Sequence, residues 1–104
     1  MHDEAKRLLG FFHGRNVASL CHRHHIRKLS VFGSVLRDDF GSASDVDVVV
    51  DFEPGRAPGL AFFDIQEELS ALVGRRVDLT TPGFLSSYFR DDVLHEAEVA
   101  YVAP

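Results

Sequence analysis

Apolar and polar positions along the chain follow a helical period in some stretches and an alternating period in others. Near the start, apolar residues at helical spacing predict helix within residues 3–13 and again within 17–24, with Asn16 as the N-cap of the second stretch. Gly10 and Gly14 weaken this pattern, so one helix or two would fit it. Alternating or β-branched runs predict four strands, at residues 28–32, 45–52, 76–80 and 99–102.

The segments between the predicted strands show further helical spacing. Residues 60–73 carry apolar positions three and four apart and end at Gly74, which predicts one helix of that length. Residues 34–39 predict a short helix, and residues 84–97 predict a helix in pieces. Because strands and helices alternate, the sequence predicts an α/β or α+β fold, a sheet covered by helices.

Aromatic residues gather in two of these segments, and core packing is the expected role of both groups. The first group, Phe62 and Phe63 with Ile65, falls within the predicted helix 60–73. The second group, nearer the C-terminus, consists of Phe84, Leu85, Tyr88 and Phe89. An apolar patch formed by this second group would also suit contact with a partner protein.

Composition narrows the class of protein. The 104 residues suit a single domain, and 45% hydrophobic with 26% charged residues is typical of a globular protein. The net charge of −5 argues against direct binding to nucleic acid or to a membrane surface. The single cysteine, Cys21, excludes an intrachain disulfide. With no apolar run of about 20 residues and no signal-peptide pattern, the expected compartment is the cytoplasm.

Carboxylates interrupt the most strongly predicted strand. Asp45, Asp47 and Asp51 alternate with apolar residues, so they project from one face of the strand while the valines form the core face. Residues two apart on a strand have Cα atoms roughly 6.5–7 Å apart, close enough for two carboxylates to share a cation. Without a cation the two charges repel, and Mg²⁺ prefers such oxygen ligands. An alternative is an amphipathic edge strand whose acids merely face water.

A Gly-Ser turn precedes these acids by ten residues. Gly33 lets the backbone approach a phosphate closely, and Ser34 adds a hydroxyl at the start of the predicted short helix. Arg37 lies one helical turn further on, where a guanidinium meets phosphate oxygens. Hydrogen-bond donors that bind phosphate at the end of one strand, with paired acids on the next strand, are typical of a site that transfers phosphoryl groups.

The spacing of Gly33-Ser34 and Asp45-Val46-Asp47, with Arg37 and Ser44 between them, resembles the signature of the minimal nucleotidyltransferases of the DNA polymerase β-like superfamily. The likeness runs from about Asn16 to Tyr101 and implies that family's small mixed sheet with packed helices. It leaves residues 1–15 as an N-terminal helical extension of a single domain, residues 1–104.

The resemblance also implies roles for individual residues. Asp45 and Asp47 would hold Mg²⁺, while Gly33, Ser34, Arg37 and Ser44 would bind ATP. The family's third acid matches Asp78, which interrupts an apolar strand and would complete the metal site or act as general base. Family members often follow the arginine with glycine, where this chain has Asp38 and Asp39, two acids that either weaken ATP binding or face solvent. Asp51 lies roughly 13 Å along the strand from Asp47 and is expected to be solvated.

The stretch Cys21-His22-Arg23-His24-His25 invites a second, metal-binding reading, because its histidines and cysteine fall three and four residues apart. Cationic groups at a helix end are ordinary, however, and a basic patch that meets an acidic partner is the better alternative.

Small proteins of this family resemble antitoxins whose partner is a HEPN-domain ribonuclease toxin. The resemblance implies a Mg²⁺-dependent enzyme that transfers AMP from ATP to a tyrosine hydroxyl of that toxin, with which it forms a hetero-oligomer. One alternative is a non-catalytic antitoxin that neutralises its partner by stoichiometric binding. Another is a small-molecule nucleotidyltransferase, which the lack of a substrate domain disfavours.

Overall fold

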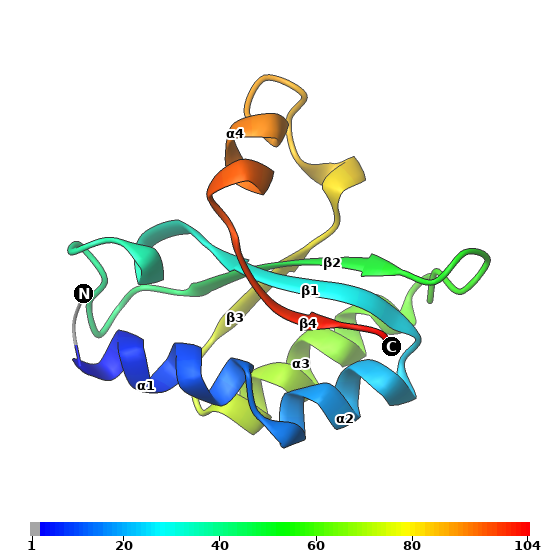
Figure 1. Ribbon diagram of the computed structural model, residues 1–104, viewed down its shortest axis with the longest axis horizontal. Helices are drawn as coiled ribbons and strands as arrows, with labels where there is room; N and C mark the ends of the chain where they lie inside the picture. Colours follow the sequence, from blue (N-terminus) through cyan, green and yellow to red (C-terminus); the bar gives the residue numbers. More distant parts are fainter. Residues whose placement is uncertain (1–2) are drawn as a thin grey trace.

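Three helices cover one face of a four-stranded sheet, and one short helix stands over the other face (Figure 1). The computed structural model describes residues 3–104, and within that range no helix is long and apolar enough to cross a bilayer. The observed mixture of strands and helices confirms the predicted fold class. In chain order the elements are α1 (Asp3–Phe12), α2 (Arg15–Arg23), β1 (Ile26–Phe32), the 3₁₀ turn η1 (Gly33–Leu36), β2 (Val46–Phe52), α3 (Ala61–Val73), β3 (Val77–Thr80), the 3₁₀ turn η2 (Pro82–Phe84), α4 (Arg90–Glu96) and β4 (Glu98–Val102).

The sheet is mixed, with strand order β3-β2-β1-β4. β1 pairs antiparallel with both β2 and β4, whereas β2 and β3 run parallel and are joined by α3. β2 is therefore an inner strand with partners on both sides. Its residue Asp47 lies opposite Phe32 of β1 and opposite Asp78 of β3.

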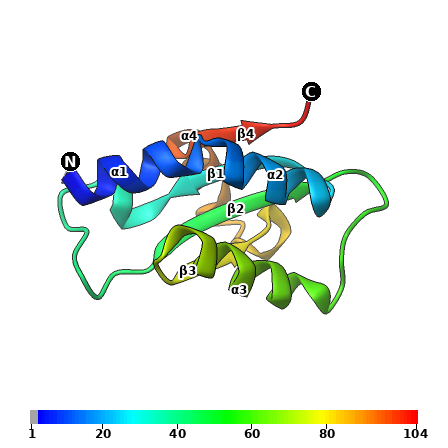
Figure 2. The ribbon, with the colours of Figure 1, turned by 90° about the horizontal axis from the view of Figure 1, so that it is seen from below.

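The core lies between the sheet and the helices α1, α2 and α3. On this face α1 and α2 follow one another end to end, and α3 runs alongside them (Figure 2). The valines Val46, Val48 and Val50 of β2 are fully buried there, as the alternating pattern predicted. Full burial of a large apolar side chain contributes about 1.5–3 kcal/mol. The helices contribute Ala5, Leu8, Leu9 and Phe12 from α1, Val17, Leu20 and Cys21 from α2, and Ile65 and Leu69 from α3.

The buried face of α1 therefore belongs to the common core. Residues 1 and 2, which also belong to the single domain and the N-terminal extension expected from the sequence, lie outside the described residues.

The N-terminal stretch, for which one helix or two would fit the sequence, forms the two helices α1 and α2. The prediction that Asn16 caps the second helix was wrong, because the N-cap is Gly14, whose backbone is extended. The Gly14 carbonyl accepts the first helical hydrogen bond, from the Ala18 amide at 3.2 Å, and its amide donates to the Phe11 carbonyl at 2.9 Å. Gly14 thus ends one helix and begins the next in a single residue. The C-terminus of α3 matches its prediction, since Gly74 adopts a left-handed conformation with φ 75°.

The predicted core role of the aromatic groups was right only in part. Ile65 is buried and Phe62 partly buried, whereas 61% of Phe63 is exposed. Near the C-terminus the exposed fractions are 79% for Phe84 and 88% for Tyr88, so core packing was the wrong reading for these side chains. The reason is that the segment from η2 to α4 rises away from the sheet instead of lying flat on it (Figure 1).

Candidate functional site

The turn after β1 packs directly against a carboxylate of β2. Gly33 has φ 81°, a conformation that L side chains rarely adopt. A Cβ atom at this position would overlap Oδ2 of Asp47 and lie 3.1 Å from its carboxyl carbon. Both the backbone conformation and the closeness of Asp47 therefore favour glycine here, since a Cβ atom would force the Asp47 carboxylate to move.

Acidic side chains gather at this end of the sheet. Asp47 and Asp78 are direct neighbours on the parallel strands β2 and β3, and Asp45 comes just before β2 begins. The pKa of Asp47 is raised, first by burial and then by the negative charges of Asp78 and Asp45. The guanidinium of Arg37 acts in the opposite direction and lowers that pKa. The three acids predicted from the sequence thus lie close enough to act on one another.

The segment after Gly33 is shorter than expected. Helix was predicted over residues 34–39, but the structure forms only the four-residue turn η1, so that prediction was wrong. The backbone of Arg37 is extended and its amide donates to the Ser34 carbonyl at 2.9 Å, which ends the turn. A single 3₁₀ turn has little dipole, so phosphate binding here would depend on the close backbone, the hydroxyl of Ser34 and the charge of Arg37.

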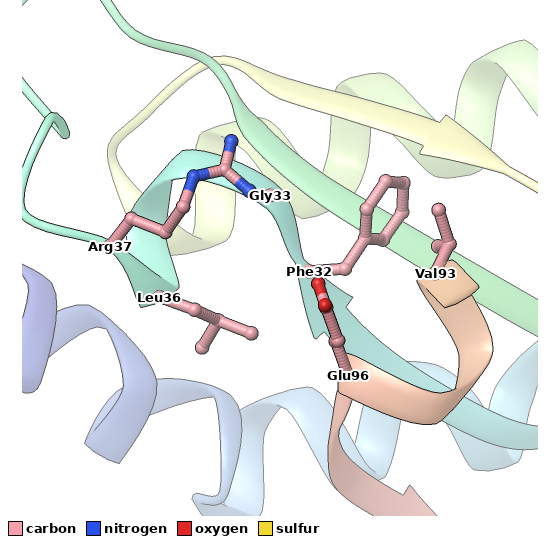
Figure 3. A pocket seen from close by; sticks show the side chains of 6 residues that line it. All are labelled: Phe32, Gly33, Leu36, Arg37, Val93 and Glu96. Atoms are coloured by element: carbon pink, nitrogen blue, oxygen red, sulfur yellow. The ribbon is translucent and has the colours of Figure 1, made fainter. Parts of the chain in front are cut away.

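A pocket of about 400 Å³ opens beside this turn (Figure 3). Gly33 and Arg37 line it together with Phe32 and Leu36, and the Arg37 side chain extends back toward Gly33. The opposite wall is made by Val93 and Glu96 of α4. Sequence reasoning missed these two residues because about sixty residues separate them from Gly33, and no local pattern marks them.

The acids have the donor chemistry that a hard divalent cation requires. Asp45, Asp47 and Asp78 supply only carboxylate oxygens, and the repulsion that raises the pKa of Asp47 is what a bound cation would relieve. Within residues 3–104, however, no three histidine, cysteine, aspartate or glutamate side chains lie close enough to hold one ion. The three carboxylates therefore suit Mg²⁺ by their chemistry. They are neighbours, but their oxygens do not point to one common position.

Other residues from the sequence signature lie near the acids but make local contacts. Ser44, expected to bind nucleotide, accepts a hydrogen bond on Oγ from the Gly41 amide at 3.0 Å. Asp39 pairs with Arg37 at 3.6 Å, and both are largely exposed, as is Asp38. The extra acid Asp39 is therefore partly neutralised by the arginine that precedes it.

The side chains of the histidine-rich stretch contact carboxylates of the same chain. His24 and Arg23 both contact Glu68 of α3, and His25 lies 3.5 Å from Glu53. Cys21 is buried in the core, which raises its pKa to about 12. The basic patch predicted at this end of α2 is thus largely matched by acids of the same chain.

Comparison with known proteins agrees with this geometry. A profile described as "Nucleotidyltransferase domain" matches residues 16–100, a range that holds every acid of the site. The chain belongs to the nucleotidyltransferase family. This nucleotidyltransferase is similar to the protein adenylyltransferase MntA of Thermococcus cleftensis, with 43% identity over 81 residues, covering 77% of this chain and 78% of the relative.

Solved structures show the same fold for the nucleotidyltransferase. A structure described as a minimal nucleotidyltransferase shares 36% identity, with a TM-score of 0.74, covering 92% of this chain and 95% of the other. The second likeness is to a chain in a complex of the tri-AMPylated Shewanella oneidensis HEPN toxin with its MNT antitoxin. There the identity is 15% and the TM-score 0.64, covering 95% of this chain and 73% of the other, which is a likeness of fold.

Proposed function

We propose that this nucleotidyltransferase is an antitoxin that acts in the cytoplasm as a Mg²⁺-dependent protein adenylyltransferase. Its substrate is ATP, and its acceptor is a tyrosine hydroxyl of a HEPN-type toxin with which it forms a hetero-oligomer. The observation that carries the proposal is the contact between the Gly33 turn and the Asp47 carboxylate, with Asp78 on the next strand. Phosphate-binding backbone and metal-binding acids meet at this point.

The transfer requires one bond to form and one to break. The acceptor hydroxyl oxygen bonds to the α-phosphorus of ATP, the bond from that phosphorus to the bridging oxygen breaks, and pyrophosphate leaves. The hydroxyl proton passes to a carboxylate, for which Asp78 is the expected base. Gly33 and Ser34 would bind the β- and γ-phosphates, and Arg37 would offset their charge. Asp45 and Asp47 would hold the metal, and Asp78 would complete that site where it does not act as the base. Mg²⁺, when bound, neutralises charge on the triphosphate.

A protein acceptor is supported by the surface of the molecule. An apolar pocket of about 570 Å³ is lined by Leu60, Phe63 and Phe84 among others, all three largely exposed. Exposed apolar groups gathered in this way are typical of a surface that meets another protein. The relative from Thermococcus cleftensis is named for modification of a protein, which agrees with this reading.

The test uses purified protein, Mg²⁺ and a co-expressed HEPN-domain protein from the same organism. ATP labelled at the α-phosphate is added to one sample and ATP labelled at the γ-phosphate to another. Transfer of AMP predicts label on the toxin from the α-phosphate alone, and loss of that label with EDTA. Peptide mass spectrometry then identifies the modified residue, which we expect to be tyrosine.

Two results would contradict the proposal. Label from the γ-phosphate would indicate transfer of the terminal phosphoryl group. A toxin that is bound and silenced without any label would favour the non-catalytic antitoxin, which neutralises by stoichiometric contact.

A further inference from the structure

Arg75, in the short connection between α3 and β3, contacts the loop that leads into the acids. Its side chain is only 15% exposed, although it carries a full charge. Its Nη2 atom donates to the Gly41 carbonyl at 2.9 Å and to the Ser44 carbonyl at 2.7 Å. Its Nη1 atom pairs with Glu4 of α1, and the guanidinium lies 4.5 Å from the centre of the Phe40 ring. One side chain thus joins α1 and the start of β3 to the loop before β2.

The loop has few other bonds to hold its shape. The Ser44 amide donates to the Gly41 carbonyl at 3.1 Å, and the Gly41 amide donates to Oγ of Ser44 at 3.0 Å. These two bonds close a turn upon itself but do not attach it to the rest of the protein. Besides the burial of the preceding Phe40 in the core, the turn is attached by Nη2 of Arg75, which donates to both of its carbonyls.

Asp45 lies between two anchored peptide groups. The carbonyl before it, that of Ser44, accepts from Arg75. The amide after it, that of Val46, donates to the Arg76 carbonyl at 2.9 Å. The backbone on both sides of Asp45 is therefore fixed by two consecutive residues, Arg75 and Arg76, of the segment just before β3. This matters because Asp45 is itself exposed and lies outside β2.

Electrostatics would otherwise drive Asp45 away from the site. Asp45 and Asp78 both act on Asp47 as like charges. A mobile loop would relieve that repulsion by turning the Asp45 carboxylate toward water. We propose that Arg75 is a positioning residue that holds Asp45 beside Asp47 and Asp78 before any cation is bound. The inference deepens the proposed function and rests on it for the identity of the cation.

Lysine should not replace arginine in this role. The guanidinium presents donors in a planar fork, so one group serves two carbonyls and Glu4 while stacking on Phe40. An ammonium keeps the charge but not this geometry. Arg75→Lys therefore keeps the positive charge and removes the planar set of donors. Glu4→Gln removes only the ion pair to α1. Arg76→Lys is the matched control, because the contribution of Arg76 to the loop comes from its backbone carbonyl.

The first measurement is amide hydrogen exchange by NMR on the metal-free protein, at the amides of Gly41, Ser44 and Val46. In Arg75→Lys we expect exchange at these three amides to rise about tenfold, with β1 amides unchanged, because only the loop loses its attachment. The second is Mn²⁺ affinity by electron paramagnetic resonance, which we expect to weaken about tenfold. Glu4→Gln and Arg76→Lys should stay within about twofold of the native protein in both measurements.

Native exchange at the three amides in Arg75→Lys would overturn the proposal. Faster exchange across the whole sheet would also overturn it, because Arg75 would then be a general structural residue. The exchange measurement does not depend on catalysis. If the native protein transfers no AMP, the proposed function fails, while the exchange result still decides whether Arg75 holds the loop.

Discussion

The two ends of β2 both carry an aspartate on the same face of the sheet, but the surroundings of the two carboxylates are opposite in charge. At the C-terminal end, Asp51 lies 3.9 Å from Arg27, and Glu53 beyond the strand pairs with His25. At the N-terminal end, Asp47 faces Asp78 and lies near Asp45, so two of its neighbours share its charge and Arg37 opposes them. The C-terminal acids lie beside basic side chains of β1 and of the turn before it, whereas the N-terminal acids are crowded together.

This contrast distinguishes Asp51, which forms an ion pair on the surface, from the crowded acids, for which we expect a role in the reaction. A surface ion pair such as that of Asp51 contributes at most about 1 kcal/mol and demands no special backbone. Crowded carboxylates destabilise the folded state and persist where another function requires them. Gly33, where a Cβ atom would meet the Asp47 carboxylate, lies at the crowded end.

The largest expected effect comes from neutralising one acid at each end. Asp47→Asn should lower AMP transfer at least about hundredfold, because it removes a metal-binding carboxylate from the site. Asp51→Asn should leave the rate within about twofold, since its charge serves only an ion pair. Initial rates with α-labelled ATP measure both. Equal losses in the two variants would erase the distinction between the ends of β2.

A second pair of variants compares glycines near the two ends. Gly33 and Gly55 have nearly equal positive φ, 81° and 78°, but a Cβ at Gly55 would have no atom within 4 Å. Gly55→Ala should therefore cost only backbone strain, about 1–2 kcal/mol in the free energy of unfolding. Gly33→Ala should cost about 1–3 kcal/mol more, because the methyl group must displace the Asp47 carboxylate. Urea unfolding measures the difference, and equal costs would mean that Asp47 moves aside freely.

The smallest effect is a change of stability with pH, which we expect from Asp47 at the crowded end. The pKa of Asp47 is raised in the folded protein, so the folded state holds more protons than the unfolded state between the two pKa values. Stability conferred by the protonated form is therefore lost as the pH rises through that window. Asp47→Asn should melt a few degrees higher than the native protein at pH 7 in metal-free buffer.

That gain should disappear as the pH falls below about 3.9, the pKa of an unfolded aspartate, because the native carboxyl is then neutral as well. Asp51→Asn is the control and should melt at the same temperature as the native protein or slightly lower. A lower melting temperature for Asp47→Asn at pH 7 would contradict the view that this carboxylate is crowded.

The local pattern of apolar and polar residues was enough to predict the strands and which residues of β2 face the core. The alternation of valine with aspartate gave β2 within one residue, and the apolar spacing before Gly74 gave α3. Each of these signals depends on residues that are neighbours in the sequence. The meeting of Asp47 with Asp78 followed only from the family resemblance, since pairing of β2 with β3 spans thirty residues.

Features that depend on distant contacts escaped prediction. The exposure of Phe84 and Tyr88 is decided by how far the segment before α4 rises from the sheet, and an apolar sequence reads alike whether it meets a core or a partner. Arg75 has no signal in its own neighbourhood, because its partners Glu4 and Ser44 come from distant parts of the chain. Val93 and Glu96 are brought to the pocket by the same long-range folding.

The single thiol of this protein has a practical consequence. Cys21 is fully buried and its pKa is raised to about 12, so in the folded state it is neither accessible nor ionised. A thiol reagent can reach it only when α2 separates from the sheet. The rate of alkylation at Cys21 therefore measures opening of the core without any added label, and the folded protein can be handled without a reducing agent.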